Sequence, residues 1–144
     1  MTDSRHTLLR GQFDLTWSLF EYHLERLEPV PVPTIGWISW HIGWWWSVTI
    51  DHARGRLPRQ RTEITWPGGG KAAVDWLRDL RTDWLAVLDR LDDAALDATA
   101  PFPWQHDPGH TVADMLACVN SELMKNAAEI GQLRLLRAAR EPDR

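Results

Sequence analysis

Three polar side chains near the end of the chain share one edge of an apolar pattern. In the segment SELMKNAAEIGQ, Glu122, Asn126 and Glu129 are spaced at i, i+4 and i+7, which places them on one edge of a helix. Polar groups beside a core cost free energy unless they find partners, so this edge is a candidate site. The two glutamates lie about 10.5 Å apart along a helix, so one small ion can bind Asn126 and one glutamate but not both glutamates.

An ordinary structural role accounts for the same residues. Lys125 and Glu129, at i and i+4, can form a helix ion pair, while Glu122 and Asn126 bond to the backbone or to tryptophan N–H groups. The spacing alone leaves both hypotheses open.

His41 is the main candidate outside this segment. It follows Ile38 by three residues and precedes Trp45 by four, which places it at the edge of a second apolar stripe, where a neutral imidazole can bind a metal. The alternative is a hydrogen-bonded histidine packed among tryptophans. His52, three helical turns further on and near a helix end, is expected to be exposed, and His23 is expected to have a structural role.

Apolar residues at spacings of three and four predict the helices that must position these side chains. The first is amphipathic, with a stripe that includes Phe13 and Trp17. Thr34 is expected to cap the second helix, and Thr111 with Asp114 the fourth. The four predicted helices, joined by connectors, span about residues 5–28, 34–54, 71–92 and 111–140.

The composition indicates one globular domain, residues 1–144. Charged residues make up 25% of the chain and hydrophobic residues 44%, which excludes disordered and low-complexity chains. Because no alternating strand pattern and no repeat accompany the helical pattern, we expect an all-α four-helix bundle. The connectors are long enough that helix spacing alone does not decide between an up-down-up-down order and one with a long crossover.

Charge and cysteine content limit the partners and the compartment. The net charge of −4 argues against a nucleic acid bound by phosphate neutralisation. The lone cysteine, Cys118, cannot form an internal disulfide and is expected to be a buried, inert thiol. Since the first residues lack the apolar core of a signal peptide, a cytoplasmic, bacterial-type protein is expected.

Tryptophan is the main compositional anomaly, with ten residues, five of them between positions 37 and 46. Residues 29–50 contain no charged side chain, but the prolines in the first part of this stretch leave only 17 residues, Thr34 to Ile50, for a helix, and this helix has several polar side chains. A buried helix is therefore expected rather than a membrane span, and its tryptophans serve a core or a pocket.

The segments PTIGWISWHIG and HTVADMLACVNSELMKNAAEIGQL together resemble the DinB-like superfamily, the damage-inducible, YfiT-type proteins, over nearly the whole chain. The resemblance implies a four-helix bundle in up-down-down-up order with a long crossover. It also implies a divalent metal held by three histidines, one on the second helix and two on the fourth in the pattern His-x3-His-x-Gly-Gln. Several similar proteins are thiol transferases that use low-molecular-weight thiols.

The family pattern matches this chain only in part. His41 takes the place of the first family histidine, and Gly131 and Gln132 that of the Gly-Gln pair. The other two histidines fall on Lys125 and Glu129, so a three-histidine site is excluded. The similar mycothiol-dependent isomerases have a glutamate in place of one histidine, so a mixed site is still compatible with the resemblance.

Two hypotheses follow from the resemblance and the residues together. In the first, His41, Asn126 and Glu129 hold a zinc or nickel ion between the second and fourth helices, and the protein is a thiol transferase or a hydrolase-type enzyme acting on a small molecule. Whether Glu122 replaces Glu129 as a ligand is left open, and no catalytic residue is assigned. In the second, the bundle is non-catalytic and metal-free, with a Lys125–Glu129 pair, and it binds a small ligand or self-associates under stress, with a homodimer indicated if tryptophans are exposed.

Overall fold

The computed structural model describes residues 4–24, 33–104 and 107–141. It contains α-helices and one short 3-10 helix, and within the described residues the only β-type pairing is an isolated bridge between Thr99 and Thr111. The prediction of an all-α bundle is confirmed. The elements are α1 (Ser4–Leu24), α2 (Ile35–Ala53), η1 (Arg61–Glu63), α3 (Lys71–Leu88), α4 (Asp93–Leu96) and α5 (Val112–Arg140). Residues 25–28 of the first predicted helix lie outside the described residues.

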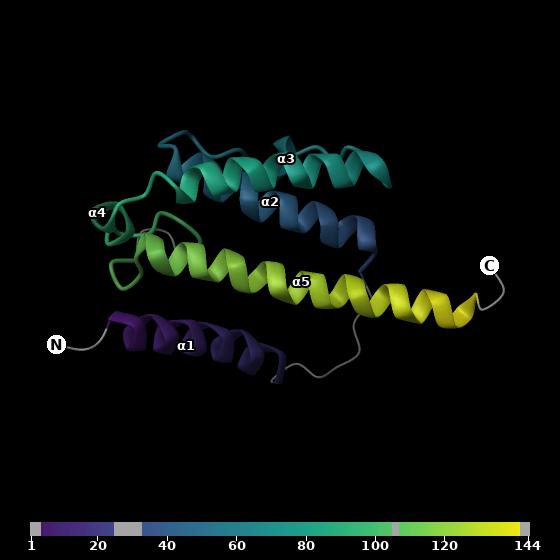
Figure 1. The fold of residues 1–144 in the computed structure, drawn as a ribbon, viewed down its shortest axis with the longest axis horizontal. Helices are drawn as coiled ribbons and strands as arrows, with labels where there is room; N and C mark the ends of the chain where they lie inside the picture. The colour runs from purple at the N-terminus through teal and green to yellow at the C-terminus, as the bar shows by residue number, and fades with distance from the viewer. Residues whose placement is uncertain (1–3, 25–32, 105–106, 142–144) are drawn as a thin grey trace.

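The four long helices lie side by side, and α5 is at the centre of the arrangement (Figure 1). It contacts α1 on one side and α2 on the other, and α2 in turn contacts α3. The colour gradient shows α1 and α5 running in one direction and α2 and α3 in the opposite one. The segment from 54 to 70 therefore runs back along the bundle before α3 begins.

Side-chain caps fix where α2 and α5 begin, as their sequences predict. Thr34 Oγ1 accepts a hydrogen bond from the backbone N–H of Trp37 at 3.1 Å. At the start of α5, Thr111 and Asp114 form a reciprocal capping box, in which each side chain accepts from the other residue's N–H. These bonds satisfy N–H groups that would otherwise have no partner in the first helical turn.

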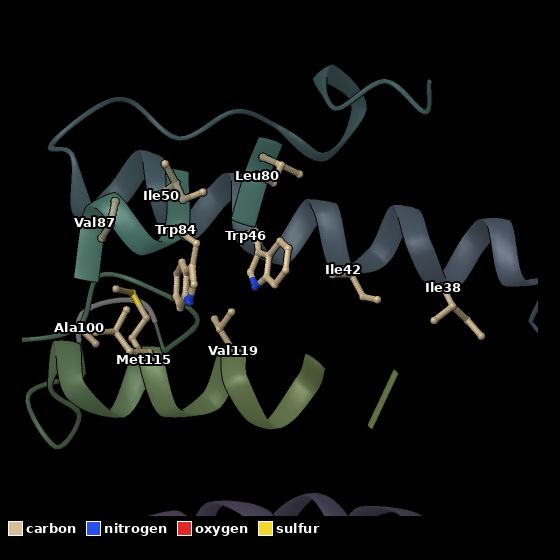
Figure 2. Close-up of a cluster of buried hydrophobic side chains, with 11 residues drawn as sticks. Ile38, Ile42, Trp46, Ile50, Leu80, Trp84, Val87, Ala100, Met115 and Val119 are labelled. Atoms are coloured by element: carbon tan, nitrogen blue, oxygen red, sulfur yellow. The ribbon is translucent and has the colours of Figure 1, made fainter. Parts of the chain in front are cut away.

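Figure 2 shows the core, in which side chains of α2, α3 and α5 converge, with Trp46 and Trp84 between the helices. Removal of this apolar surface from water, worth about 2 kcal/mol for each large side chain, is the main force that holds the three helices together. Gly43 on α2 lies so close to the ring of Trp76 that a Cβ atom there would overlap it. The buried cluster comprises Ile38, Ile42, Trp46, Ile50, Leu80, Trp84, Val87, Ala100, Met115, Leu116 and Val119.

The predicted stripe of α1 is not all directed inward. Phe13 and Trp17 are 61% and 46% exposed, and their rings stack on each other with centroids 6.3 Å apart. Because α1 has its main described helix contact with α5 alone, only part of its surface is covered. None of the described helices combines the length and the apolar character that crossing a bilayer requires.

Candidate functional site

His41 lies on α2 in a stack of aromatic rings. Its imidazole is sandwiched between Trp37, at 4.9 Å and 12° between ring planes, and Trp44, at 5.6 Å and 29°. The indole N–H of Trp45 donates to Nε2 of His41 at 2.9 Å. This is the arrangement of the alternative hypothesis, a hydrogen-bonded histidine packed among tryptophans. Its other ring nitrogen, Nδ1, is buried and has no hydrogen-bond partner among the described residues.

The carboxylate nearest to His41 is that of Glu122 on α5. Its Oε2 lies 3.8 Å from Nε2 of His41 and 3.3 Å from Nζ of Lys125. Burial alone would raise the pKa of Glu122, but the contact with His41 and the charge of Lys125 outweigh it and lower that pKa below its ordinary value. Glu122 is therefore ionised at neutral pH, and its charge is balanced by the ammonium of Lys125.

The predicted ion pair between Lys125 and Glu129 is wrong. Lys125 contacts Glu122, one turn earlier, at i and i−3 instead of i and i+4. Side chains three and four residues apart on a helix can both form ion pairs, so either glutamate is close enough to Lys125 by spacing alone. The carboxylate of Glu122 is only 11% exposed, so its attraction for the ammonium is less weakened by water than that of a more exposed partner.

Asn126 and Glu129 form a second pair on α5. Asn126 is fully buried, and its Nδ2 donates to Oε2 of Glu129 at 3.0 Å. Its Oδ1 is buried and has no hydrogen-bond partner among the described residues. The structure thus pairs His41 with Glu122, and Asn126 with Glu129, where the sequence predicts one set of His41, Asn126 and Glu129.

The contacts of His41 and Glu122 oppose the binding of a divalent metal at this place. Across the described ranges, no group of three or more histidine, cysteine, aspartate or glutamate side chains is arranged to hold a metal ion. The lone pair of His41 Nε2 already accepts from Trp45, and the ammonium of Lys125 repels a cation from Glu122. Binding through His41, Asn126 and Glu129 stays a prediction that requires the hydrogen bond from Trp45 to His41 to break.

Cys118, one turn before Glu122 on α5, is not an activated nucleophile. Burial, and secondarily the negative charge of Glu122, raise the pKa of its thiol to about 11. The thiol is therefore protonated at neutral pH, whereas thiol chemistry requires the thiolate. The raised pKa accords with the inert thiol expected from the sequence, but Cys118 is half-buried where a buried side chain was expected.

Two aromatic contacts were not evident from the sequence. His52, expected to be exposed, is half-buried and stacks on Phe102 with ring centroids 5.7 Å apart. Phe102 lies in the loop before α5, and spacing within α2 carries no information about it. The guanidinium of Arg61, in η1, lies over the rings of both Trp40 and Trp44. A lone arginine in an irregular connector gives no pattern from which this contact could be found.

Comparison with protein families gives one match. The family model described as the DinB superfamily matches residues 12–130, which is more than half of the chain and includes His41, Lys125 and Glu129. No curated protein and no solved structure matches the chain significantly.

Proposed function

The chain belongs to the DinB superfamily, and from that premise we propose that it works without a metal, as a non-catalytic bundle that binds a small ligand. The observation that carries this proposal is the contact of Lys125 with Glu122 beside His41. The resemblance places a metal-binding histidine at position 125, and here the chain supplies a positive charge of its own.

Electrostatics explains why this ammonium and a metal ion are alternatives. The carboxylate of Glu122 is 11% exposed and the side chain of Lys125 is 30% exposed, so water only partly screens the charges. Two cations that share one such carboxylate repel each other strongly at a separation of a few ångströms. A metal bound by His41 and Glu122 would have to displace Lys125 and also break the hydrogen bond from Trp45.

The groups around this contact are also engaged or in a state unsuited to catalysis. Glu122, with its lowered pKa, has no proton to donate at neutral pH, and its Oε2, which could accept one, already accepts from Lys125. Cys118, with its raised pKa, is not a thiolate. The lone pair of His41 Nε2, which a general base would use, is engaged by Trp45. These states favour binding over chemistry.

A metal-dependent thiol transferase or hydrolase is the competing proposal. It is supported by two buried polar atoms that have no hydrogen-bond partner in the described part of the chain, Nδ1 of His41 and Oδ1 of Asn126. Such atoms are rare in proteins and call for an occupant such as water, a ligand or an ion. The metal-free proposal assigns them to bound water.

Self-association is a further property that we propose, through the exposed aromatic pair Phe13 and Trp17 on α1. Its test is analytical ultracentrifugation of the protein and of Phe13→Ser. A concentration-dependent dimer that the substitution weakens supports the homodimer, and a monomer at all concentrations contradicts it.

The metal-free proposal is tested by thermal unfolding with zinc, with nickel and with a chelator. A metal that binds only the folded chain, and whose free concentration is 100 times its Kd, adds about 2.7 kcal/mol to the free energy of unfolding. We expect the unfolding midpoint to be the same in all three conditions, and the same insensitivity in His41→Ala. A midpoint that rises with metal in the protein but not in His41→Ala would favour the competing proposal.

A further inference from the structure

Three tryptophans, of which Trp37 is exposed and the other two are half-buried, form an aromatic stripe along α2. Trp37, Trp40 and Trp44 are spaced at i, i+3 and i+7, so they share one side of the helix. The guanidinium carbon of Arg61 lies 5.0 Å from the ring centroid of Trp40 and 5.1 Å from that of Trp44. Both distances are within the range of a cation–π interaction. One gap of the stripe, between Trp40 and Trp44, therefore already holds a cation that the chain provides.

The other end of the stripe borders a hollow of about 430 Å³. Its size is within the range of small-molecule sites. Trp37 is 46% exposed, so the hollow opens to solvent. The hollow is lined by uncharged residues: Thr34, Gly36, Trp37, Trp40 and Trp66.

The walls of this tryptophan hollow are held in place from outside it. The indole N–H of Trp40 donates to the carbonyl of Ile64 at 2.8 Å, which fixes the ring against the connector. Trp66 packs edge-on against Trp76 of α3, with centroids 6.1 Å apart and planes at 86°. At Gly36 no side chain fills the space, and a Cβ there would be 3.7 Å from Trp66. A rigid, preformed wall lowers the cost of binding.

The connector that carries Arg61 and Trp66 is itself anchored to α2. Arg59 donates from Nε and Nη2 to the two oxygens of Asp51, at 2.8 and 3.2 Å, and Asp51 is only 4% exposed. A two-bond contact between guanidinium and a buried carboxylate holds both groups in one geometry. The aromatic surfaces therefore keep their positions without a ligand.

We propose that the tryptophan hollow binds a small quaternary ammonium cation, that is, a nitrogen that carries four carbon substituents. Indole rings offer π-faces and N–H donors but no acceptor, and the one side-chain oxygen in the lining, that of Thr34, already accepts from the backbone N–H of Trp37. A primary ammonium would leave N–H groups unsatisfied there, whereas a quaternary one has none to satisfy. Aromatic cages recognise such cations by cation–π attraction.

The charge of the protein is compatible with this ligand. The net charge is −4, which favours the approach of cations. Arg61 is exposed, so water weakens its repulsion of a second cation near Trp40. This inference rests on the proposed function, because it names the ligand class of the binding protein proposed above.

The test is a proton NMR titration with choline, in which the N-methyl resonance reports binding. Aromatic faces shift that resonance upfield, so we expect a saturable upfield shift. Trp37→Ala is expected to weaken binding about tenfold, the loss of one partly desolvated cation–π contact. Leu85→Ala is the control for loss of an exposed apolar side chain, because Leu85 is 40% exposed but lies on α3, and this variant is expected to bind choline like the unmodified protein.

Two further comparisons separate this site from general stickiness and from misfolding. Gly36→Leu places a side chain in the hollow without removing an aromatic ring and is expected to abolish binding, whereas Gly36→Ala is expected to weaken it at most slightly. Circular dichroism checks that both variants fold. The neutral tert-butyl analogue of choline has the same shape without the charge and is expected to bind about tenfold more weakly.

The proposal is overturned if choline gives no saturable shift, if the neutral analogue binds equally well, or if Leu85→Ala weakens binding as much as Trp37→Ala. Any of these results without bound metal would leave the metal-free function intact and remove only its assigned ligand. Stoichiometric metal with normal choline binding would overturn the metal-free function and leave the tryptophan hollow as a ligand site.

Discussion

The Nζ atom of Lys125 lies 3.3 Å from Oε2 of Glu122, one turn away on α5. The same carboxylate oxygen is the one nearest to Nε2 of His41 on α2, at 3.8 Å. Through this contact a buried negative charge between two packed helices is balanced within the chain. A metal is therefore not needed at this position to balance the charge of the carboxylate.

Removal of this ammonium should destabilise the fold more than removal of an exposed one. We expect Lys125→Ala to lower the free energy of unfolding by about 1 kcal/mol, because Glu122 stays buried without its partner. Lys71→Ala is the control, since Lys71 pairs with Asp75 while 87% exposed, and it should cost less than about 0.5 kcal/mol. Urea unfolding measures both values. Equal losses would mean that the Lys125 contact is an ordinary surface pair.

Stability should depend on the ionisation of Glu122 in a defined direction. Its pKa is lower in the folded chain than its ordinary value, so its ionised form stabilises the fold above the unfolded pKa. That contribution is lost as the pH falls through the lowered folded pKa. In Glu122→Gln the contribution is missing, so the difference in unfolding free energy between the protein and this variant should shrink on acidification. A difference that is constant, or that grows in acid, would contradict the assignment.

The thiol of Cys118 should react slowly with alkylating reagents. A pKa raised from 9.0 to about 11 reduces the thiolate fraction roughly a hundredfold at mildly alkaline pH. We expect iodoacetamide labelling, followed by mass spectrometry, to be slow in the folded protein and fast in urea. Glu122→Gln should speed the folded-state reaction modestly, because it removes the secondary cause of the raised pKa. Fast labelling of the folded chain would reopen a role for the thiol.

A methyl group at Gly43 should be poorly tolerated, because a Cβ atom there overlaps the ring of Trp76. We expect Gly43→Ala to cost about 2 kcal/mol or more of stability, since α2 and α3 must separate or Trp76 must turn. Among the described residues, Gly131 on α5 has no atom beyond its chain neighbours and its own helix backbone within 4 Å of such a Cβ, so Gly131→Ala should stabilise by about 0.5 kcal/mol through helix propensity. Thermal unfolding of the two variants checks both signs.

The long helices could be predicted because their signals are local. The apolar stripe of α5 indicates a helix, and the capping box of Thr111 and Asp114 marks where this helix begins. Thr34 marks the beginning of α2 in the same way. The turn η1 and the four-residue helix α4 are too short to show a period. The outward direction of Phe13 and Trp17 could not be predicted either, because an apolar stripe does not tell how much of it a neighbouring helix covers.

The candidate site depended on relations between helices, which spacing does not give. Glu122, Asn126 and Glu129 share one edge in sequence, but the rotation of α5 against α2 decides that Glu122 faces His41. The same rotation buries Glu122 and so draws Lys125 toward it and away from Glu129. Placement of His41 among tryptophans was predicted as an alternative, because i±3 and i±4 neighbours on one helix are certain to be close.

We propose that the chain needs no metal at the contact of His41, Glu122 and Lys125. Elemental analysis tests this on protein purified without chelators or affinity-tag metals and then incubated with zinc or nickel, alongside His41→Ala. We expect metal well below one ion per chain in both proteins. Close to one zinc or nickel per chain, lost in His41→Ala, would contradict it and establish a metal centre between α2 and α5.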